Sequence, residues 1–161
     1  MEKTQWYLGA PNSVVLCVDR IGAGQPEGRF YHAYAREGTS FSNMEEAIFQ
    51  LERFYDSLNF PHPTTDSRTF INRGGHTESR KERTRIMRDD ELLGRHGDLG
   101  TFIIRVQHRQ NSSWQGRITW MDRNRTLYFR SIWEMIKLVA SALDTVSEQE
   151  DAALEQSWQD E

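Results

Sequence analysis

A single cysteine, only three lysines and the lack of any long apolar run limit what this chain can be. Cys17 has no second cysteine with which to form a disulfide within the chain, and it lies in an apolar stretch typical of a core residue. No 18 consecutive residues are apolar, which excludes a transmembrane helix. The opening residues, MEKTQWYLGAPNSVV, also lack the basic segment and apolar stretch of a secretion signal. We therefore expect a cytoplasmic protein that does not interact with membranes.

Catalytic and metal-binding motifs are also missing. The five histidines pair with no cysteine or glutamate at a metal-ligand spacing, and neither HExxH nor CxxC occurs. Asp89, Asp90 and Glu91 are adjacent, but three adjacent acids in a polar segment are typical of a solvated helix start. No glycine-rich phosphate loop is present, and Ser112 and Ser113 have no histidine or acid whose placement the sequence can establish. The sequence thus predicts no enzymatic activity, no metal and no cofactor.

The net charge of −4 conceals an uneven distribution of charge. Residues 144–161 contain seven acidic residues and no basic one, whereas the remaining residues carry 20 basic against 17 acidic side chains. Seventeen of the basic residues are arginines, whose planar guanidinium binds carboxylates and phosphates through two parallel hydrogen bonds. This bias favours an anionic partner, although it is equally consistent with the composition of the genome.

Two stretches of the chain align without a gap when the sequence is shifted by 88 positions. The first, GRFYHAYAREGTSFSNMEEAIFQL, begins at Gly28, and the second, GRITWMDRNRTLYFRSIWEMIKLV, begins at Gly116. Apolar positions and helix-start residues coincide, as for Phe41 and Phe129. A period this long indicates a duplicated domain rather than a solenoid.

Each copy has the pattern of three strands followed by a helix. Apolar runs or alternating residues predict the strands, and short polar turns separate them. The helices begin at capping-box spacings, at Asn43 with Glu46 and at Ser131 with Glu134. Apolar residues then recur every three or four positions, at Met44, Ala47, Ile48, Leu51, Tyr55 and Leu58 and at Ile132, Met135, Ile136, Val139 and Leu143. We therefore expect an α+β fold in which two β-β-β-α repeats form one pseudo-twofold domain with an antiparallel sheet.

The expected boundaries follow from this repeat. The first β-β-β-α unit spans residues 1–60 and the second spans residues 100–143. Residues 61–99 read as a polar, arginine-rich linker or loop, whose second half is compatible with a short helix. Residues 144–161 form an acidic tail that extends the last helix or frays into solvent.

Alternation along the strands of the second unit predicts an arginine-rich sheet face. If the helix covers the apolar face, the other face carries four guanidiniums and a phenol, with the linker arginines nearby. The expected ligand-binding residues are Arg105, Arg109, Arg117, Tyr128 and Arg130, together with Arg80, Arg83, Arg85 and Arg88 of the linker. Such a face suits a phosphate or a stacked base, but an ordinary polar sheet surface has the same pattern. Trp114 and Gly116, by contrast, are expected to be a core aromatic and a close-packed backbone position.

These patterns favour a non-enzymatic binding or regulatory protein that recognises nucleic acid or a nucleotide. The alternative is a protein-interaction module, or an inhibitor of a nucleic-acid-binding enzyme of the anti-CRISPR or anti-defence type, that acts through the linker or the acidic tail. The acidic tail is also a candidate to fold over the arginine-rich face and compete with its ligand. Nucleic-acid binding that weakens steeply with salt would distinguish the first class from the second.

Residues 101–143 resemble a group of small, uncharacterised bacterial proteins. The shared features are a Gln-Asn-x-Ser-Trp-Gln-Gly turn, here residues 110–116, and a Phe-Arg-Ser helix start, here residues 129–131. The resemblance implies no activity.

The stretch NSSWQG, residues 111–116, also resembles half of the signature of PilZ domains. These domains bind cyclic di-GMP through an Asn/Asp-x-Ser-x-x-Gly motif and an upstream Arg-x-x-x-Arg. Upstream, only Lys81 and Arg85 have that spacing, while Arg105 and Arg109 lie directly before the turn, within a predicted strand. A cyclic di-GMP binder is therefore a minor alternative.

Overall fold

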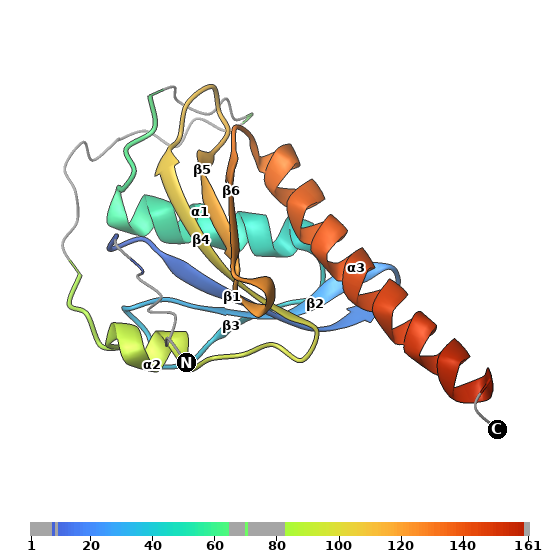
Figure 1. The fold of residues 1–161 in the computed structure, drawn as a ribbon. Coiled ribbons are helices and arrows are strands. Elements are labelled where there is room, and N and C mark those ends of the chain that lie inside the picture. Colours follow the sequence, from blue (N-terminus) through green and yellow to red (C-terminus); the bar gives the residue numbers. More distant parts are fainter. Residues whose placement is uncertain (1–7, 9, 65–69, 71–82, 160–161) are drawn as a thin grey trace.

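The structure is a computed structural model that describes residues 8, 10–64, 70 and 83–159 (Figure 1). A six-stranded antiparallel sheet has the order β3-β2-β1-β4-β5-β6. The elements are β1 (Val14–Gly22), β2 (Gln25–Tyr31), β3 (Thr39–Phe41), α1 (Met44–Leu58), α2 (Asp89–Leu93), β4 (Gly100–His108), β5 (Gln115–Trp120), η1 (Met121–Arg123), β6 (Arg125–Phe129) and α3 (Ile132–Gln159). The predicted α+β class and antiparallel sheet are confirmed. Among these elements, none is a helix with the length and apolar character needed to cross a membrane.

The two central strands are apolar because both of their faces are covered. Residues 14–18 of β1 and residues 100–104 of β4 are all buried, and they pair with each other in the middle of the sheet. A strand buried on both faces reads as a continuous apolar run rather than as an alternating one. The outer strands differ, since β6 at one edge has four exposed residues out of five.

Both long helices begin at the predicted caps. Asn43 Oδ1 accepts a hydrogen bond from the N–H of Glu46 at 2.8 Å, and Ser131 Oγ accepts one from the N–H of Glu134 at 3.1 Å. These bonds satisfy amides that the first turn of a helix leaves without a partner. The helical residues that face the sheet are buried, among them Ala47, Leu51, Tyr55, Met135, Val139 and Leu143.

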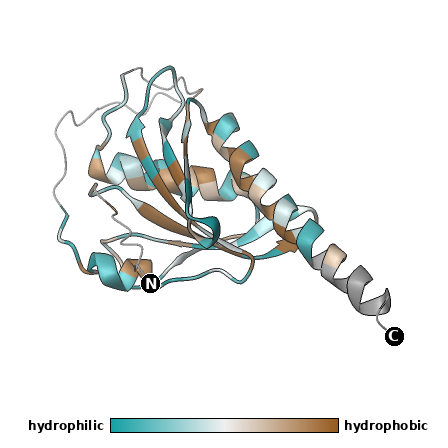
Figure 2. Cartoon of the chain, viewed as in Figure 1, coloured by the Kyte–Doolittle hydropathy of each residue, from teal (hydrophilic) through white to brown (hydrophobic). Residues whose placement is uncertain are grey.

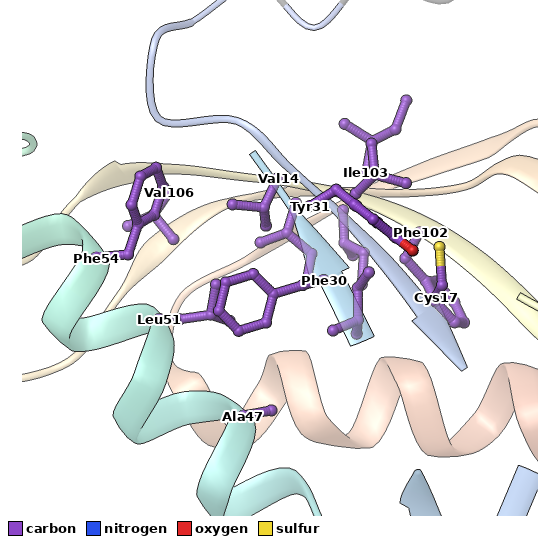
Figure 3. Close-up of a cluster of buried hydrophobic side chains, with 14 of the residues drawn as sticks. Val14, Cys17, Phe30, Tyr31, Ala47, Leu51, Phe54, Phe102, Ile103 and Val106 are labelled. Carbon is purple, nitrogen blue, oxygen red and sulfur yellow. The ribbon is translucent and has the colours of Figure 1, made fainter. Parts of the chain in front are cut away.

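The main core lies between the sheet and the two helices. In the close-up, Phe30 and Leu51 meet between the sheet and α1, whereas Ile103 points away from the helices on the other side of the sheet (Figure 3). Hydrophobic residues are concentrated on the central strands and on the helices, and polar residues predominate around α2 (Figure 2). The helices therefore define one face of the sheet, called here the helix face, and leave an opposite face.

On the opposite face, residues 83–99, which include α2, cover the half that contains β1 and β2. The N–H of Leu99 donates to the carbonyl of Val18 at 2.9 Å, and the Arg95 guanidinium lies 4.9 Å from the centre of the Tyr31 ring. Cys17, predicted to be a core residue, is buried there, and this burial raises the pKa of its thiol to about 11. The second half of the predicted linker thus packs on the sheet.

The strand registers of the two halves differ by the same 88 positions as the aligned sequences. The corresponding pairs are Cys17 with Arg29 and Arg105 with Arg117, and Gly28 with Phe41 and Gly116 with Phe129. Irregularities recur at the same offset, since the register shifts between Val18 and Arg20 and again between Val106 and His108. The turns that follow have positive φ angles at Ala23 and Gly24 and at Asn111 and Ser112.

Candidate anion-binding site

Side-chain hydrogen bonds build the turn between β4 and β5. The Gln115 amide accepts from the N–H of Gln110 at 2.9 Å and donates to the carbonyls of Gln110 at 3.0 Å and Arg130 at 3.3 Å. Ser113 Oγ accepts from the N–H of Ile132, the first residue of α3, at 2.9 Å. The distinctive QNSSWQG sequence therefore joins β4, β5, the end of β6 and the start of α3.

Trp114 and Gly116 have the structural roles that the sequence predicts. Trp114 is 1% exposed, meets the Tyr55 ring edge-on with 5.3 Å between ring centres, and donates its indole N–H to Glu52. A Cβ on Gly116 would lie 2.1 Å from the carbonyl oxygen of Arg105, so the two strands pack too closely for any side chain at this position. Trp114 is therefore not available to stack on a ligand.

Arg109 does not lie on the predicted face, and this part of the prediction is wrong. The β-bulge between Val106 and His108 adds one residue to β4, which changes the side on which later side chains point. Arg109 is 3% exposed, and its guanidinium donates to the carbonyl of Pro61 at 2.6 Å and to the carboxylate of Asp56 at 2.7 Å. Arg109 thus ties β4 to α1 on the helix face.

Three other predicted residues form a row across neighbouring strands, on the face opposite the helices. Arg105 of β4 pairs with Arg117 of β5, and Arg117 pairs with Tyr128 of β6. Side chains at directly paired positions have Cβ atoms about 5 Å apart. The two arginines are half-buried, and Tyr128 is 69% exposed. We call these three residues the cationic row.

The two arginines of the row have no acidic partner among the residues that the structure describes. The side chain of neither Arg105 nor Arg117 makes a hydrogen bond or ion pair to a described residue. Like charges at directly opposed positions of an antiparallel pair destabilise the sheet. An anion that binds both guanidiniums would relieve this repulsion, because it supplies the missing opposite charge.

Arg130 flanks the row but already shares its charge with an acid. Its guanidinium donates to the carboxylate of Glu134 at 3.2 Å, and this hydrogen bond lowers the pKa of Glu134 below its usual value. Arg130 is exposed, and its described side-chain contact is with α3 rather than with the row.

The linker arginines each have contacts of their own. Arg83 donates to Ser57 Oγ at 3.1 Å, Arg85 pairs with Asp89 at 2.8 Å, and Arg88 pairs with Glu91 at 3.2 Å. None of the three is hydrogen-bonded or ion-paired to the row within the described ranges, and Arg80 lies outside the described residues. The side-chain contacts that the structure gives for Arg83, Arg85 and Arg88 are therefore with α1 and α2.

Corresponding positions in the first half have different chemistry. Cys17, Arg29 and Ser40 stand 88 positions before the residues of the row, and there Arg29 donates to the carboxylate of Asp19 at 2.7 Å. Residues 83–99 also cover this part of the sheet, with the carbonyl of His96 accepting from Arg29 at 3.4 Å. One half thus has a neutralised and covered face, whereas the other half carries two arginines without an acidic partner in the part of the chain that the structure describes.

Comparison with known proteins does not identify the chain. No family model, curated protein or solved structure matches it. What the row can bind therefore follows from its geometry and charge.

The acidic residues of the tail begin on the other side of the sheet from the row. Residues up to Gln159 continue α3, and the part of α3 that packs on the sheet does so on the helix face. The helix then runs past the sheet in Figure 1. A tail that covered the row would have to break this helix.

The structure also has a cleft that the sequence did not predict. A cleft of about 160 Å³ lies between β5, β6 and α3 on the helix face. Its lining comes from four elements that are separate in the sequence, so no motif marks it. Strand alternation does place Ile118, Trp120 and Leu127 on the helix face, which was the one available signal.

Proposed function

We propose that this protein is a non-enzymatic binding protein that recognises an anionic ligand, a nucleic acid or a nucleotide, on the cationic row. The observation that carries the proposal is the direct pairing of Arg105 with Arg117, both half-buried and both without an acidic partner among the described residues. Structural arginines usually have a carboxylate partner, as Arg29 and Arg109 do in this protein.

The chemistry of the row suits a phosphate next to an aromatic base. Each guanidinium presents parallel N–H donors that match two phosphate oxygens. Two such groups on paired strands can hold one phosphate between them or two consecutive phosphates of a strand. Tyr128 lies beside Arg117 with its ring open to solvent, where a base can stack on it.

A titration with a fluorescent single-stranded oligonucleotide of about 12 nucleotides tests this proposal, because single-strand sites span about 4–16 nucleotides. Arg105→Gln and Arg117→Gln should each weaken binding about 5- to 10-fold and reduce the dependence of log Kd on log salt by about one. Tyr128→Ala should weaken binding with little change in salt dependence.

Arg53→Gln is the matched control, since Arg53 is an exposed arginine of α1 on the other side of the molecule. If Arg53→Gln weakened binding as much as Arg117→Gln, the binding would be a diffuse effect of charge and the row would not be the site. Cyclic di-GMP serves as a second probe, and its PilZ-like mode is disfavoured because Arg109 is buried away from Arg105.

We also propose that the two β-β-β-α units arose by duplication and are related by a pseudo-twofold axis through the sheet. The equal offset of registers, bulges and positive-φ turns supports this origin. The proposal explains why the two halves of the face opposite the helices differ: one copy acquired a covering segment, and the other acquired cations. Superposition of residues 14–58 on residues 102–146 in an experimental structure tests it.

A protein partner for α3 is the second candidate function. The helix continues to Gln159 beyond the sheet (Figure 1), and its described side chains there, such as Asp144 and Glu148, are exposed. An acidic helix of this kind suits a basic surface on a partner, including an enzyme that binds nucleic acid. Capture of a specific protein by the wild type, but not by a chain that ends at residue 146, would favour this candidate over the first.

A further inference from the structure

The cleft between β5, β6 and α3 has apolar walls and one cation. Two aromatic rings and four aliphatic side chains form the walls, from Phe102, Ile118, Trp120, Leu127, Leu138 and Ala142. Arg125 is the charged residue in the lining, and no acid is part of it. The volume of about 160 Å³ is close to that of an engineered apolar cavity, about 150 Å³, that binds benzene. The cleft therefore has room for one small ring or short chain.

One donor at this cleft is open to a ligand and lacks an acceptor. The exposed Arg125 guanidinium has no hydrogen bond or ion pair to a described residue. Arg125 is directly paired with Trp120 across β5 and β6, so the two side chains are neighbours on the helix face. The Nε1 of Trp120 also has no hydrogen-bond partner among the described residues, but it is buried, so the donor that a ligand in the cleft can reach is the guanidinium of Arg125.

The hydroxyl groups of the lining are not available as donors to an anion. Ser141 Oγ donates to the carbonyl of Leu138 at 2.8 Å, and Thr145 Oγ1 donates to the carbonyl of Ser141 at 2.9 Å. Their protons are thus used within α3, and the donor left for a ligand is the guanidinium of Arg125. A carboxylate has two oxygens and can accept two parallel hydrogen bonds from this guanidinium.

We propose that this cleft binds a small apolar carboxylate, such as an aromatic acid the size of benzoate, with its ring between β5 and α3 and its carboxylate on the Arg125 guanidinium. The site is separate from the cationic row, since strand alternation places it on the opposite face of β5 and β6. A small acid in the cleft also contacts α3 and β6 together, so it stabilises the packing of that helix on the edge of the sheet.

An NMR titration of the full chain with sodium benzoate tests the site. Benzoate should give saturable shifts in the amide signals of residues 118–127 and 138–145, with half-saturation of the order of 1 mM for a ligand of this size. Benzyl alcohol, which has the ring but no charge, should bind about five-fold more weakly. Arg125→Gln should remove that preference for benzoate.

Arg53→Gln is the matched control, because it removes an exposed arginine of α1 that belongs neither to the cleft nor to the cationic row, and it should leave benzoate binding unchanged. Several results would overturn the proposal. These are the absence of saturable shifts in the cleft, equal binding of benzyl alcohol and benzoate by the wild type, and loss of benzoate binding in Arg53→Gln. A further contrary result is a set of cleft signals that depends on protein concentration rather than on benzoate, since a second copy of the chain would then occupy the cleft.

Discussion

Val15 and Ile103 pair with each other at the centre of the sheet, and Ile103 is the residue that lies 88 positions after Val15. A twofold axis through the sheet requires such a pairing of corresponding residues. The next pair outward on one side, Leu16 with Phe102, fits the same relationship. Both hairpins then extend away from this centre with equal registers. The proposed duplication therefore accounts for the strand order: the first strands of the two units pair at the centre, and the later strands of each unit are added outward in chain order.

The two close-packed glycines allow a matched test of this equivalence. A Cβ on Gly28 would lie 1.9 Å from the carbonyl oxygen of Cys17, and a Cβ on Gly116 would lie 2.1 Å from that of Arg105. Gly28→Ala and Gly116→Ala should each lower the free energy of unfolding by about 1–3 kcal/mol, measured by urea denaturation. Gly24→Ala, in a turn with open space around it, should cost about 1 kcal/mol because its φ is +77°. A large cost at only one of the two close-packed positions would contradict the equivalence.

The facing arginines of the cationic row should weaken the fold slightly while they serve binding. Arg105→Gln or Arg117→Gln should raise the free energy of unfolding by about 0.2–0.5 kcal/mol at low salt, because each change removes the repulsion between the pair. The gain should shrink toward zero near 1 M NaCl, where the Debye length falls to about 3 Å. A double variant should gain little beyond the better single one. Urea denaturation of the two single variants and the double variant, at low and at high salt, measures these effects. An unchanged or lower free energy of unfolding in the single variants would show that the two guanidiniums do not repel each other.

Periodicity in the sequence is sufficient to predict the six strands and the two long helices of this fold. Strand alternation, the caps at Asn43 and Ser131 and the spacing of apolar residues in the helices each arise from contacts close in the chain. The sheet face of Arg105, Arg117 and Tyr128 is also correct, because these residues come before the bulge of β4 or lie on regular strands.

Features that depend on one extra residue or on packing between distant segments leave no periodic pattern in the sequence. Arg109 was placed on the wrong face because a bulge has no strong sequence signature, and one inserted residue is enough to change the side of a side chain. The covering of the first half by residues 83–99 was missed as well. Its buried residues, such as Met87 and Leu92, are too few to produce a period.

His32 should make the stability of the protein depend on pH. Its ring stacks on Phe54 with 4.1 Å between ring centres, and its Nδ1 accepts the N–H of Tyr34 at 3.1 Å. Burial, and secondarily the charge of Arg83, lowers the pKa of His32 from 6.5 to about 4. The unfolded chain thus binds a proton at a higher pH than the folded protein does. Stability that is present above about pH 6.5 is lost as the pH falls toward 4, by up to about 3 kcal/mol.

His32→Asn isolates this effect, since the Asn side chain can offer an acceptor near the position of Nδ1 and does not titrate. Between pH 7 and pH 5 the wild type should lose about 2 kcal/mol more stability than the variant in matched urea denaturation. Equal losses in the two proteins would show that His32 titrates normally in the folded state.

The two ion pairs Arg109–Asp56 and Arg85–Asp89 differ in burial but hardly in distance, which is 2.7 Å and 2.8 Å respectively. In the first pair only the arginine is buried, since the Arg109 side chain is 3% exposed and that of Asp56 is 61% exposed, whereas the side chains of the second pair are 51% and 42% exposed. Water and salt screen an exposed pair strongly, and a buried guanidinium depends much more on its carboxylate. Double-mutant cycles with Arg→Met and Asp→Ala should therefore give a coupling energy of about 1–3 kcal/mol for the first pair and below about 0.5 kcal/mol for the second. Similar couplings would mean that Glu52, which is 3.4 Å from Arg109, replaces Asp56 when that carboxylate is removed, and Glu52→Gln in the same background would then restore the difference.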